Sequence, residues 1–333
     1  MVTVDIHSHI LPQSAVKAFS EGREWFGTTF SRLPNGTPSM QTGSRSGSLG
    51  ATEYWRPHAD RLSYMDADGI DVQLLSLNPQ LIRDHLAADV AIACAQSVND
   101  EIAEAVAAHP DRFAGLAALP LQVPADAVRE LERAMSMPGM RGFIVGSHVD
   151  GRNWDDESLF PILEAAEHLG AFILLHPFNS RIREPFPRFH MVNLIGNPLE
   201  TTIAAASLIL GGVLDRLPNM KICLSHAGGY LPAAIGRFDH GFAHRPEVRA
   251  NVQRKPSEYL RNFFYDCISH SEVGLEQVIG LVGVDRILLG TDFPADMGLR
   301  RPIEWLAAQT HLTAADRAAI QGGNAARLGL CGI

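Results

Sequence analysis

The sequence predicts an α/β fold and, within that class, a (β/α)8 barrel. Two observations support this prediction. Eight short apolar runs rich in β-branched residues recur along the 333 residues, and longer amphipathic stretches separate most of them. Most of the runs are continuously apolar rather than alternating, which is typical of parallel strands covered on both faces. A doubly wound open sheet is the alternative, but no G-x-G-x-x-G motif follows the first run to support it.

The eight expected strands follow one another along a single domain that covers residues 1–333. They are VTVDIH (2–7), IDVQLLSL (70–77), FAGLAAL (113–119), GFIVGS (142–147), AFILLHP (171–177), KICLSH (221–226), FFYDCI (263–268) and RILLGTDF (286–293). Helical spacing of apolar residues predicts helices over 88–109, 125–135 and 156–169. Gly170 is expected to cap the last of these helices.

Two segments interrupt the alternation of strands and helices. Residues 11–60, which contain LPNGTPS and QTGSRSGSLGA, are expected to form a long mobile loop or cap inserted after the first strand. Residues 178–198 are expected to form an extended loop after the fifth strand. Loops of this length after barrel strands usually cover or shape a functional site.

Composition excludes several classes of partner. The net charge of -9 argues against a surface for nucleic acid or for anionic membranes. No run approaches the ~18 apolar residues of a membrane span, and Asp5 stands where a signal peptide would have its apolar core. The four cysteines form no C-x-x-C pair, and two of them lie in apolar runs. We therefore expect a reduced, cytoplasmic protein without a cysteine metal site.

Polar residues stand where several of the predicted strands end. They are His7, His9, His176, His226 and Asp292. In a barrel these strand ends converge on one face, and side chains at i and i+2 of a strand point the same way. Any one histidine alone is more typical of a hydrogen-bonded structural residue, but burying several unpaired polar side chains together would be costly. Imidazoles with a carboxylate suit Zn²⁺, or Mn²⁺ or Fe²⁺ in a more open shell, so the pattern predicts a metal site.

Five motifs together resemble the amidohydrolase superfamily, and more narrowly its aminocarboxymuconate-semialdehyde decarboxylase-like family. They are DIHSHILP, LLHP, LSHAGG, IGRFDHGF and LLGTDFP, and the resemblance extends from Val4 to about Leu330. It implies that four residues bind one divalent ion, with Zn²⁺ the first choice and Mn²⁺ possible: His7, His9, His176 and Asp292. Binuclear members of the superfamily carry a lysine at the end of the fourth strand, and GFIVGS has none.

The resemblance also implies a reaction. His226 would be the catalytic acid–base residue, and Asp292 is a second catalytic candidate as a base. The expected activity is nonoxidative decarboxylation of a small unsaturated or aromatic carboxylic acid, with the ion activating water or a substrate oxygen. The alternative is a metal-dependent hydrolase or hydratase that opens a lactone, an amide or a double bond. A non-catalytic binding protein is disfavoured because no expected metal position is substituted.

Substrate contacts are implied by fewer residues. Arg237 matches a family arginine that reaches the neighbouring subunit's site, which implies a homodimer; a local pair with Asp239 is the alternative. A second family arginine lies four residues before a tryptophan, but Ala51 stands there in this chain. Arg45 is the candidate replacement. Phe178 and Trp55 are candidate contacts with a planar substrate, although an aromatic ring in a loop such as that of Trp55 more often packs to hold the loop in place. Other arginines remain open as carboxylate contacts or as solvent-facing charges: Arg56, Arg61, Arg181, Arg183 and Arg188.

Asp5 precedes His7 by two residues. By strand alternation it shares the face of His7, so it is a candidate to hydrogen-bond an imidazole.

Overall fold

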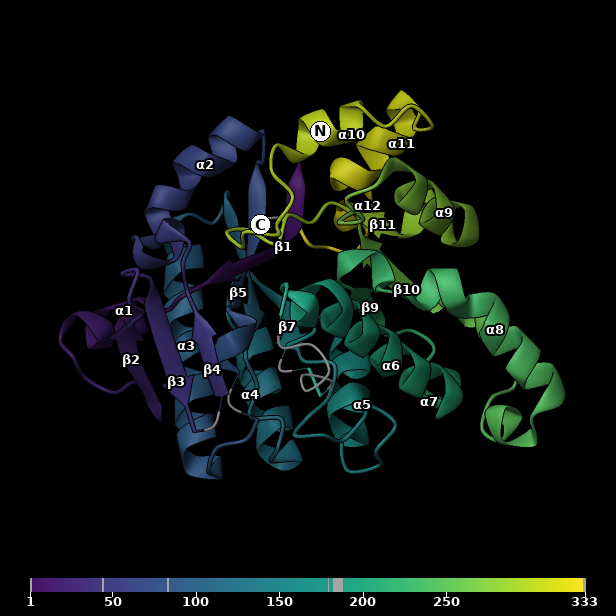
Figure 1. The fold of residues 1–333 in the computed structure, drawn as a ribbon, viewed down its shortest axis with the longest axis horizontal. Helices are drawn as coiled ribbons and strands as arrows, with labels where there is room; N and C mark the ends of the chain where they lie inside the picture. Colours follow the sequence, from purple (N-terminus) through teal and green to yellow (C-terminus); the bar gives the residue numbers. More distant parts are fainter. Residues whose placement is uncertain (1, 44, 83, 179, 182–187, 332–333) are drawn as a thin grey trace.

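The structure is a computed structural model that describes residues 2–43, 45–82, 84–178, 180–181 and 188–331. Eight strands form one sheet in which each strand pairs in parallel with the next along the chain (Figure 1). They are β1 (Val4–Ile10), β5 (Val72–Leu77), β6 (Phe113–Ala117), β7 (Met140–Val145), β8 (Phe172–Leu175), β9 (Lys221–Leu224), β10 (Phe263–Asp266) and β11 (Ile287–Leu288). The first and last strands close the sheet, because Ile6 N donates to the Leu289 carbonyl at 2.9 Å and His9 N to the Phe293 carbonyl at 2.7 Å. The predicted (β/α)8 barrel is confirmed.

Helices cover the outside of the barrel. The larger ones are α3 (Ala88–Ala108), α4 (Pro124–Met135), α5 (Phe160–Leu169), α6 (Asn197–Leu210), α8 (Leu231–His244) and α9 (Glu272–Val282). The predicted helix over 156–169 begins only at Phe160, because the Asp156 carboxylate binds the backbone N–H and the hydroxyl of Ser158 in a turn. Gly170 adopts a left-handed φ of 63° at its end, as expected. Among the described helices, none combines the length and hydropathy of a membrane span.

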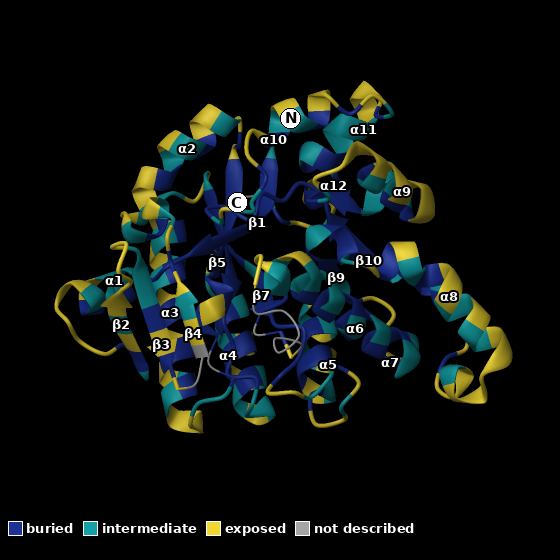
Figure 2. Cartoon of the chain, in the orientation of Figure 1, coloured by how far each residue is buried: buried dark blue, intermediate teal, exposed yellow. Residues whose placement is uncertain are grey.

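The strands bury both of their faces, as their continuous apolar runs predict (Figure 2). One cluster gathers alternate strand residues such as Ile6, Leu74 and Leu174 inside the barrel. A second, larger cluster joins the other strand faces to helix residues such as Val98 and Leu131. The barrel interior is therefore a packed core, and only its rim is left for chemistry.

Residues 11–60 do not form the long mobile loop that the sequence predicts. They contain helix α1 (Gln13–Ser20) and a three-stranded antiparallel sheet of β2 (Thr28–Arg32), β3 (Pro38–Thr42) and β4 (Arg45–Ser48). Buried Trp25 and Met40 join the large core cluster. The Glu101 carboxylate on α3 accepts the backbone N–H groups of Gln13 and Ser14 at the start of α1. Glycine and serine content predicted flexibility here, but this packing holds the segment against the barrel.

The segment after the fifth strand is partly outside the described residues. Within its described part, a π-helical turn over Val192–Gly196 continues directly into α6. The smaller helical elements complete the fold: α2 (Arg61–Asp68), α7 (Val213–Arg216), α10 (Pro302–Ala307), α11 (Ala314–Ala318) and α12 (Asn324–Arg327). All four cysteines are free thiols.

Gly142 provides a test of the barrel's packing. It pairs with Phe172 on the neighbouring strand, and a Cβ atom at Gly142 would lie 1.8 Å from the Phe172 carbonyl oxygen. We expect Gly142→Ala to lower the free energy of unfolding by at least about 2 kcal/mol, since overpacking forces backbone to move. Gly280→Ala on α9 is the control, because a Cβ there meets open space; helix propensity predicts a gain of up to about 1 kcal/mol. Urea denaturation of both variants measures the difference, and equal stability would contradict this account of the strand.

Candidate metal and catalytic site

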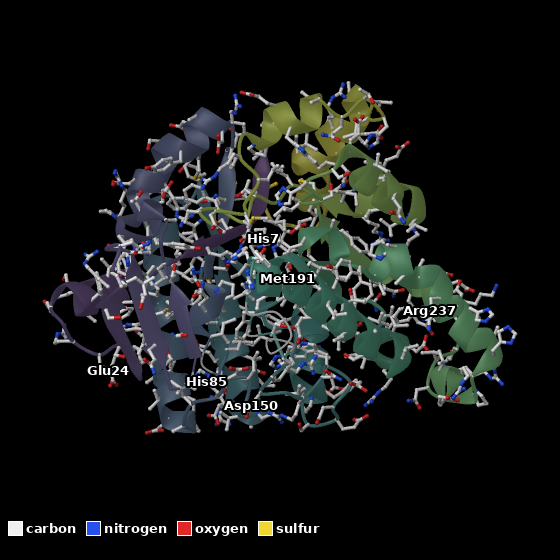
Figure 3. The ribbon with its side chains drawn as sticks, in the orientation of Figure 1. His7, Glu24, His85, Asp150, Met191 and Arg237 are labelled. Carbon is white, nitrogen blue, oxygen red and sulfur yellow. The ribbon has the colours of Figure 1, made fainter. Side chains whose placement is uncertain are left out.

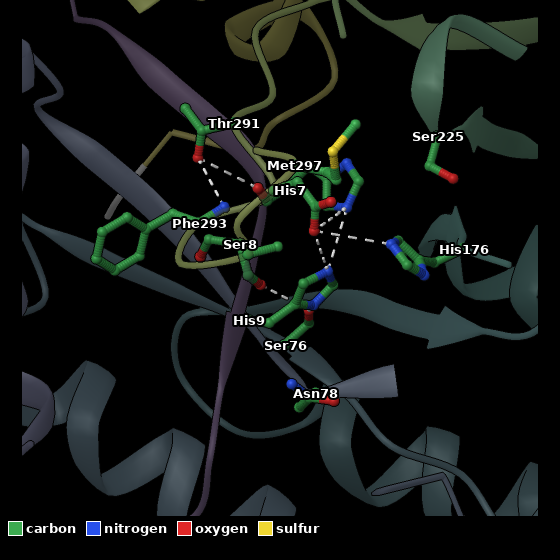
Figure 4. Close-up of polar contacts among 12 residues, drawn as sticks. His7, Ser8, His9, Ser76, Asn78, His176, Ser225, Thr291, Phe293 and Met297 are labelled. Atoms are coloured by element: carbon green, nitrogen blue, oxygen red, sulfur yellow. Dashed lines mark hydrogen bonds and ion pairs between the residues drawn. The ribbon is translucent and has the colours of Figure 1, made fainter. Parts of the chain in front are cut away.

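The structure brings the predicted metal ligands together at one rim of the barrel. His7 and His9 lie on β1, His176 follows β8, and Asp292 follows β11. One ligand atom from each of these residues lies within 4.8 Å of all the others, and all four residues are buried. Figure 4 shows the imidazoles of His7, His9 and His176 converging. Residues from opposite ends of the chain therefore share one centre, as the closure of β1 against β11 requires.

The spacing of the four ligand atoms suits a divalent ion. Asp292 Oδ1 lies 3.0 Å from His9 Nε2, 3.4 Å from His7 Nε2 and 3.8 Å from His176 Nε2. His7 Nε2 and His9 Nε2 are 3.2 Å apart. A tetrahedral zinc site with bonds near 2.0–2.1 Å separates neighbouring ligand atoms by about 3.3 Å. The four residues therefore surround a space of the right size.

His176 tests whether these residues fit a metal rather than a hydrogen-bond network. Both of its ring nitrogens are buried, and neither has a hydrogen-bond partner among the described residues. A buried polar atom without a partner is costly and uncommon. Burial also lowers the pKa of His9 to about 4 and the pKa of His176 well below its usual range, so both rings are neutral. Neutral imidazole with an unused lone pair is the form that binds a metal.

Asp266 orients His7, and the sequence analysis missed it. This buried carboxylate ends β10 and accepts the Nδ1–H of His7 at 2.7 Å. Since Nδ1 carries the proton, Nε2 directs its lone pair toward the centre; carboxylates commonly hold metal-binding histidines in this way. The signal was present in FFYDCI, whose aspartate stands at a strand end like the other site residues.

The carboxylates at the centre require positive charge. Burial opposes charge on His7, but Asp292 and Asp266 outweigh it and raise the pKa of His7 to about 10. The pKa of Asp292 lies well below its usual range because His7, His176 and His226 outweigh its burial. A proton on His7 or a divalent cation can meet this demand, and only the cation also supplies the partner that His176 lacks.

His226 stands beside the metal centre but outside the group of four. It follows β9, and its Nε2 lies 3.4 Å from Asp292 Oδ2. The backbone N–H groups of His226 and Ala227 both donate to Asp266, at 2.9 and 2.8 Å. These bonds hold both residues at left-handed φ angles of 54° and 53°. The His226 side chain is 20% exposed. The imidazole therefore reaches a site open to substrate, as proton transfer requires.

A cavity of about 510 Å³ opens over the centre and is lined by His9, His176, His226 and Asp292. A second cavity of about 300 Å³ adjoins it and shares His226 and Asp292. Small-molecule sites commonly have volumes of ~300–1,000 Å³. The arrangement therefore has room for a small organic acid next to both the metal ligands and His226.

The two aromatic candidates have different surroundings. Phe178 lines the main cavity, as a contact with a planar substrate requires. Trp55 does not: its ring packs against Phe19 and its indole N–H donates to the Leu49 carbonyl at 3.0 Å. Its neighbour Tyr54 lines the cavity instead. The packing of Trp55 matches the alternative in which its ring holds the inserted segment in place, and the neighbouring position in the 3-10 turn over Thr52–Trp55 faces the cavity.

Arg237 is exposed on α8 and lines neither cavity (Figure 3). Asp239, its alternative local partner, instead accepts the N–H and the hydroxyl of Ser257. Arg45 begins β4, and its side chain lies outside what the structure describes. Ser46 and Ser48 of the same strand line the main cavity.

The remaining arginine candidates have other surroundings. Arg61 is buried, not a surface charge, and donates to Gln73 and to the His9 carbonyl. Arg181 pairs with fully buried Glu200 at 2.9 Å. The other candidates are Arg56, which is exposed near Asp60; Arg188, which is exposed over Phe189; and Arg183, which lies outside the described residues.

Asp5 does not bind an imidazole, contrary to the prediction. The pairing of β1 with β5 shifts in register between Asp5 and Ser8, so the simple alternation of faces fails there. Asp5 instead accepts Gln73 Nε2 at 2.8 Å and the Thr291 hydroxyl at 2.6 Å. It joins β1 to the loop that carries Asp292.

Comparison with known proteins identifies similar chains. The model of the family described as "Amidohydrolase" matches residues 4–328. A 2-amino-3-carboxymuconate-6-semialdehyde decarboxylase of Dictyostelium discoideum is 34% identical over 97% of this chain and 90% of its own length. The crystal structure of 5-carboxyvanillate decarboxylase from Sphingomonas paucimobilis superposes with a TM-score of 0.84 at 26% identity, covering 98% of each chain. A dihydroxybenzoic acid decarboxylase from Polaromonas sp. JS666, solved with manganese and 2-nitroresorcinol, gives 0.80 at 25% identity, covering 98% of this chain and 96% of its own.

Asp266→Asn tests the orientation of His7. The amide retains the shape but provides a weaker, neutral acceptor, so we expect the affinity for a divalent ion to fall about 10- to 100-fold. Competition with a chelator, followed by elemental analysis, measures the affinity. Asp111→Asn removes an exposed carboxylate elsewhere and should leave metal binding unchanged. Full metal affinity in Asp266→Asn would show that the carboxylate has no part in the site.

Proposed function

The chain belongs to the amidohydrolase family, and from this premise we propose that it is a metal-dependent decarboxylase, a carbon–carbon lyase that releases CO₂ from a small unsaturated or aromatic carboxylic acid. One observation carries the proposal: the buried group of His7, His9, His176 and Asp292 lies directly beside His226 in the wall of a cavity. The similar proteins are named as decarboxylases and match nearly the whole chain. Their names favour the lyase over the hydrolase or hydratase alternative.

The chain's own residues support this chemistry. A divalent ion held by the four ligands would supply Lewis acidity that orients the substrate's oxygens and offsets negative charge. His226 reaches into the cavity from β9 and can deliver a proton to the carbon that loses CO₂. The Asp292 carboxylate lies next to the His226 ring, so it can hold the imidazole in position or accept a proton itself.

The identity of the metal is a finer part of the proposal. We assign Zn²⁺, because neutral imidazoles together with a carboxylate are ligands that suit it. Mn²⁺ is the alternative, and the dihydroxybenzoic acid decarboxylase was solved with manganese. Elemental analysis of protein purified without added metal separates the two.

The assembly and the substrate contacts are likewise proposals. We assign a cytoplasmic homodimer in which Arg237 reaches the cavity of the other subunit. Two features of Arg237 support this role: it is exposed on α8, and its side chain forms no hydrogen bond or ion pair with the described residues. Arg45 and Phe178 are the further proposed contacts, because Phe178 and the other residues of β4 line the cavity. The four free cysteines suit a reducing compartment.

His226→Asn tests the reaction. Loss of the acid–base group should lower kcat for CO₂ release by about 10²- to 10⁴-fold while the bound metal is retained. The assay screens dienoic and hydroxybenzoic acids for CO₂ and follows solvent deuterium into the product. His244→Asn, on the exposed end of α8, is the matched control. A product that contains oxygen from water, with no CO₂ released, would refute the lyase.

Mixing inactive chains tests the role of Arg237. If Arg237 serves the partner's site, a heterodimer of Arg237→Ala and His226→Asn chains contains one site with both residues intact. We expect such heterodimers to regain up to about half of the wild-type activity per dimer, since only one of the two symmetry-related sites is intact. Purification through two different affinity tags verifies the heterodimer. Verified heterodimers without activity would exclude a contribution across the interface.

A further inference from the structure

Tyr54 belongs to the inserted segment, yet it lies in the wall of the main cavity. The 3-10 turn over Thr52–Trp55 places its ring among the core residues, where it is 7% exposed. It lines the cavity together with Asn78, His9, His176 and Asp292. The segment that covers the barrel therefore brings a hydroxyl group to the same cavity as the metal ligands.

Hydrogen-bond partners limit what the hydroxyl can do. Asn78 follows β5 and its side-chain oxygen accepts the backbone N–H of Gln80 at 2.9 Å. The same side chain forms a hydrogen bond with the Tyr54 hydroxyl. This bond lowers the pKa of Tyr54, as a donor to the phenolic oxygen does, so the Asn78 amide nitrogen donates to Tyr54. Within the described residues, the hydroxyl has no second partner, so its own hydrogen is available toward the cavity.

The electrostatic surroundings keep that hydrogen in place. Burial, and then the negative charge of Asp292, raise the pKa of Tyr54 well above its ordinary value. The hydroxyl is therefore a neutral donor at physiological pH. A neutral hydroxyl can donate a hydrogen bond to an anionic oxygen of a ligand, and such charge-assisted bonds are strong.

We propose that Tyr54 is a substrate-binding residue whose hydroxyl, oriented by Asn78, donates a hydrogen bond to an anionic or phenolic oxygen of the acid in the cavity. This inference rests on the proposed function and narrows its substrate class. The preferred acid carries an oxygen, either of its carboxylate or of a hydroxyl substituent, that reaches the wall formed by the inserted segment. Asn78 is a positioning residue, because it acts through Tyr54.

Tyr54→Phe tests the donor with two binding probes. Ligand-observed NMR titration of the zinc-loaded protein measures the dissociation constants of benzoate, which has only the carboxylate, and of resorcinol, which has only hydroxyls. Losing one hydrogen bond to a carboxylate or hydroxyl oxygen should lower the affinity for one of the two probes about 10- to 100-fold. If only benzoate binds more weakly, the carboxylate accepts the hydrogen bond from Tyr54. If only resorcinol binds more weakly, the hydroxyl substituent accepts it. Unchanged dissociation constants for both probes would overturn the proposal.

Asn78→Ala and the double variant test the positioning role. Asn78→Ala should weaken the same probe about 3- to 10-fold, and the double variant should bind no more weakly than Tyr54→Phe alone. Tyr64→Phe, on α2 against Phe293 and outside the cavity, is the control. If the double variant lost as much binding free energy as the two single variants together, the positioning role of Asn78 would be overturned. None of these readouts depends on turnover, so a failure to release CO₂ would refute the proposed function separately.

Discussion

The rest of the site depends on one electrostatic constraint, which is that two buried carboxylates face three imidazoles at the end of a parallel barrel. Asp292 and Asp266 have lost their hydration, and their charge must be met within the protein. A proton on His7 would meet part of this demand, but it would leave His176 Nε2, the ring nitrogen that faces Asp292, without a hydrogen bond. A divalent ion meets both needs at once. The metal site is therefore a consequence of charge balance as much as of ligand geometry.

The same constraint explains why Asp266 matters to both sides of the site. Its carboxylate binds the His7 ring and also the backbone N–H groups of His226 and Ala227. A single buried anion thus sets the tautomer of a metal ligand and holds the neighbouring loop in a left-handed conformation, which non-glycine residues adopt only when other bonds fix it. The His226 backbone and the His7 ring are therefore tied to the same carboxylate, so the fold maintains the distance between them.

Chemistry at strand ends could be predicted from this sequence because a barrel gathers those ends whatever their separation along the chain. His7, His9, His176, His226 and Asp292 were placed together by that argument alone, and all eight strands were predicted. The errors arose where local geometry departs from regular periodicity. A shift in register separates Asp5 from the imidazoles, and Tyr54, which the sequence analysis did not single out, lines the cavity from a 3-10 turn. The sheet within residues 11–60 was not predicted because its strands are short and polar and contain few buried residues. It is stabilised by the contacts of Trp25 and Met40 with the large core cluster, which are distant in sequence.

The two parts of the cavity wall come from different kinds of structure, and this division bears on specificity. The barrel strands supply the ligands and His226, whose positions are coupled through Asp266 and through the closure of β1 against β11. The inserted segment supplies Tyr54 and the residues of β4, which contact the barrel mainly through apolar packing and a few hydrogen bonds. Substitutions in the segment can therefore change which oxygens of a substrate are recognised without disturbing the charge balance at the metal. Chains with the same barrel centre can then act on different carboxylic acids, in keeping with the range of acids named for the similar decarboxylases.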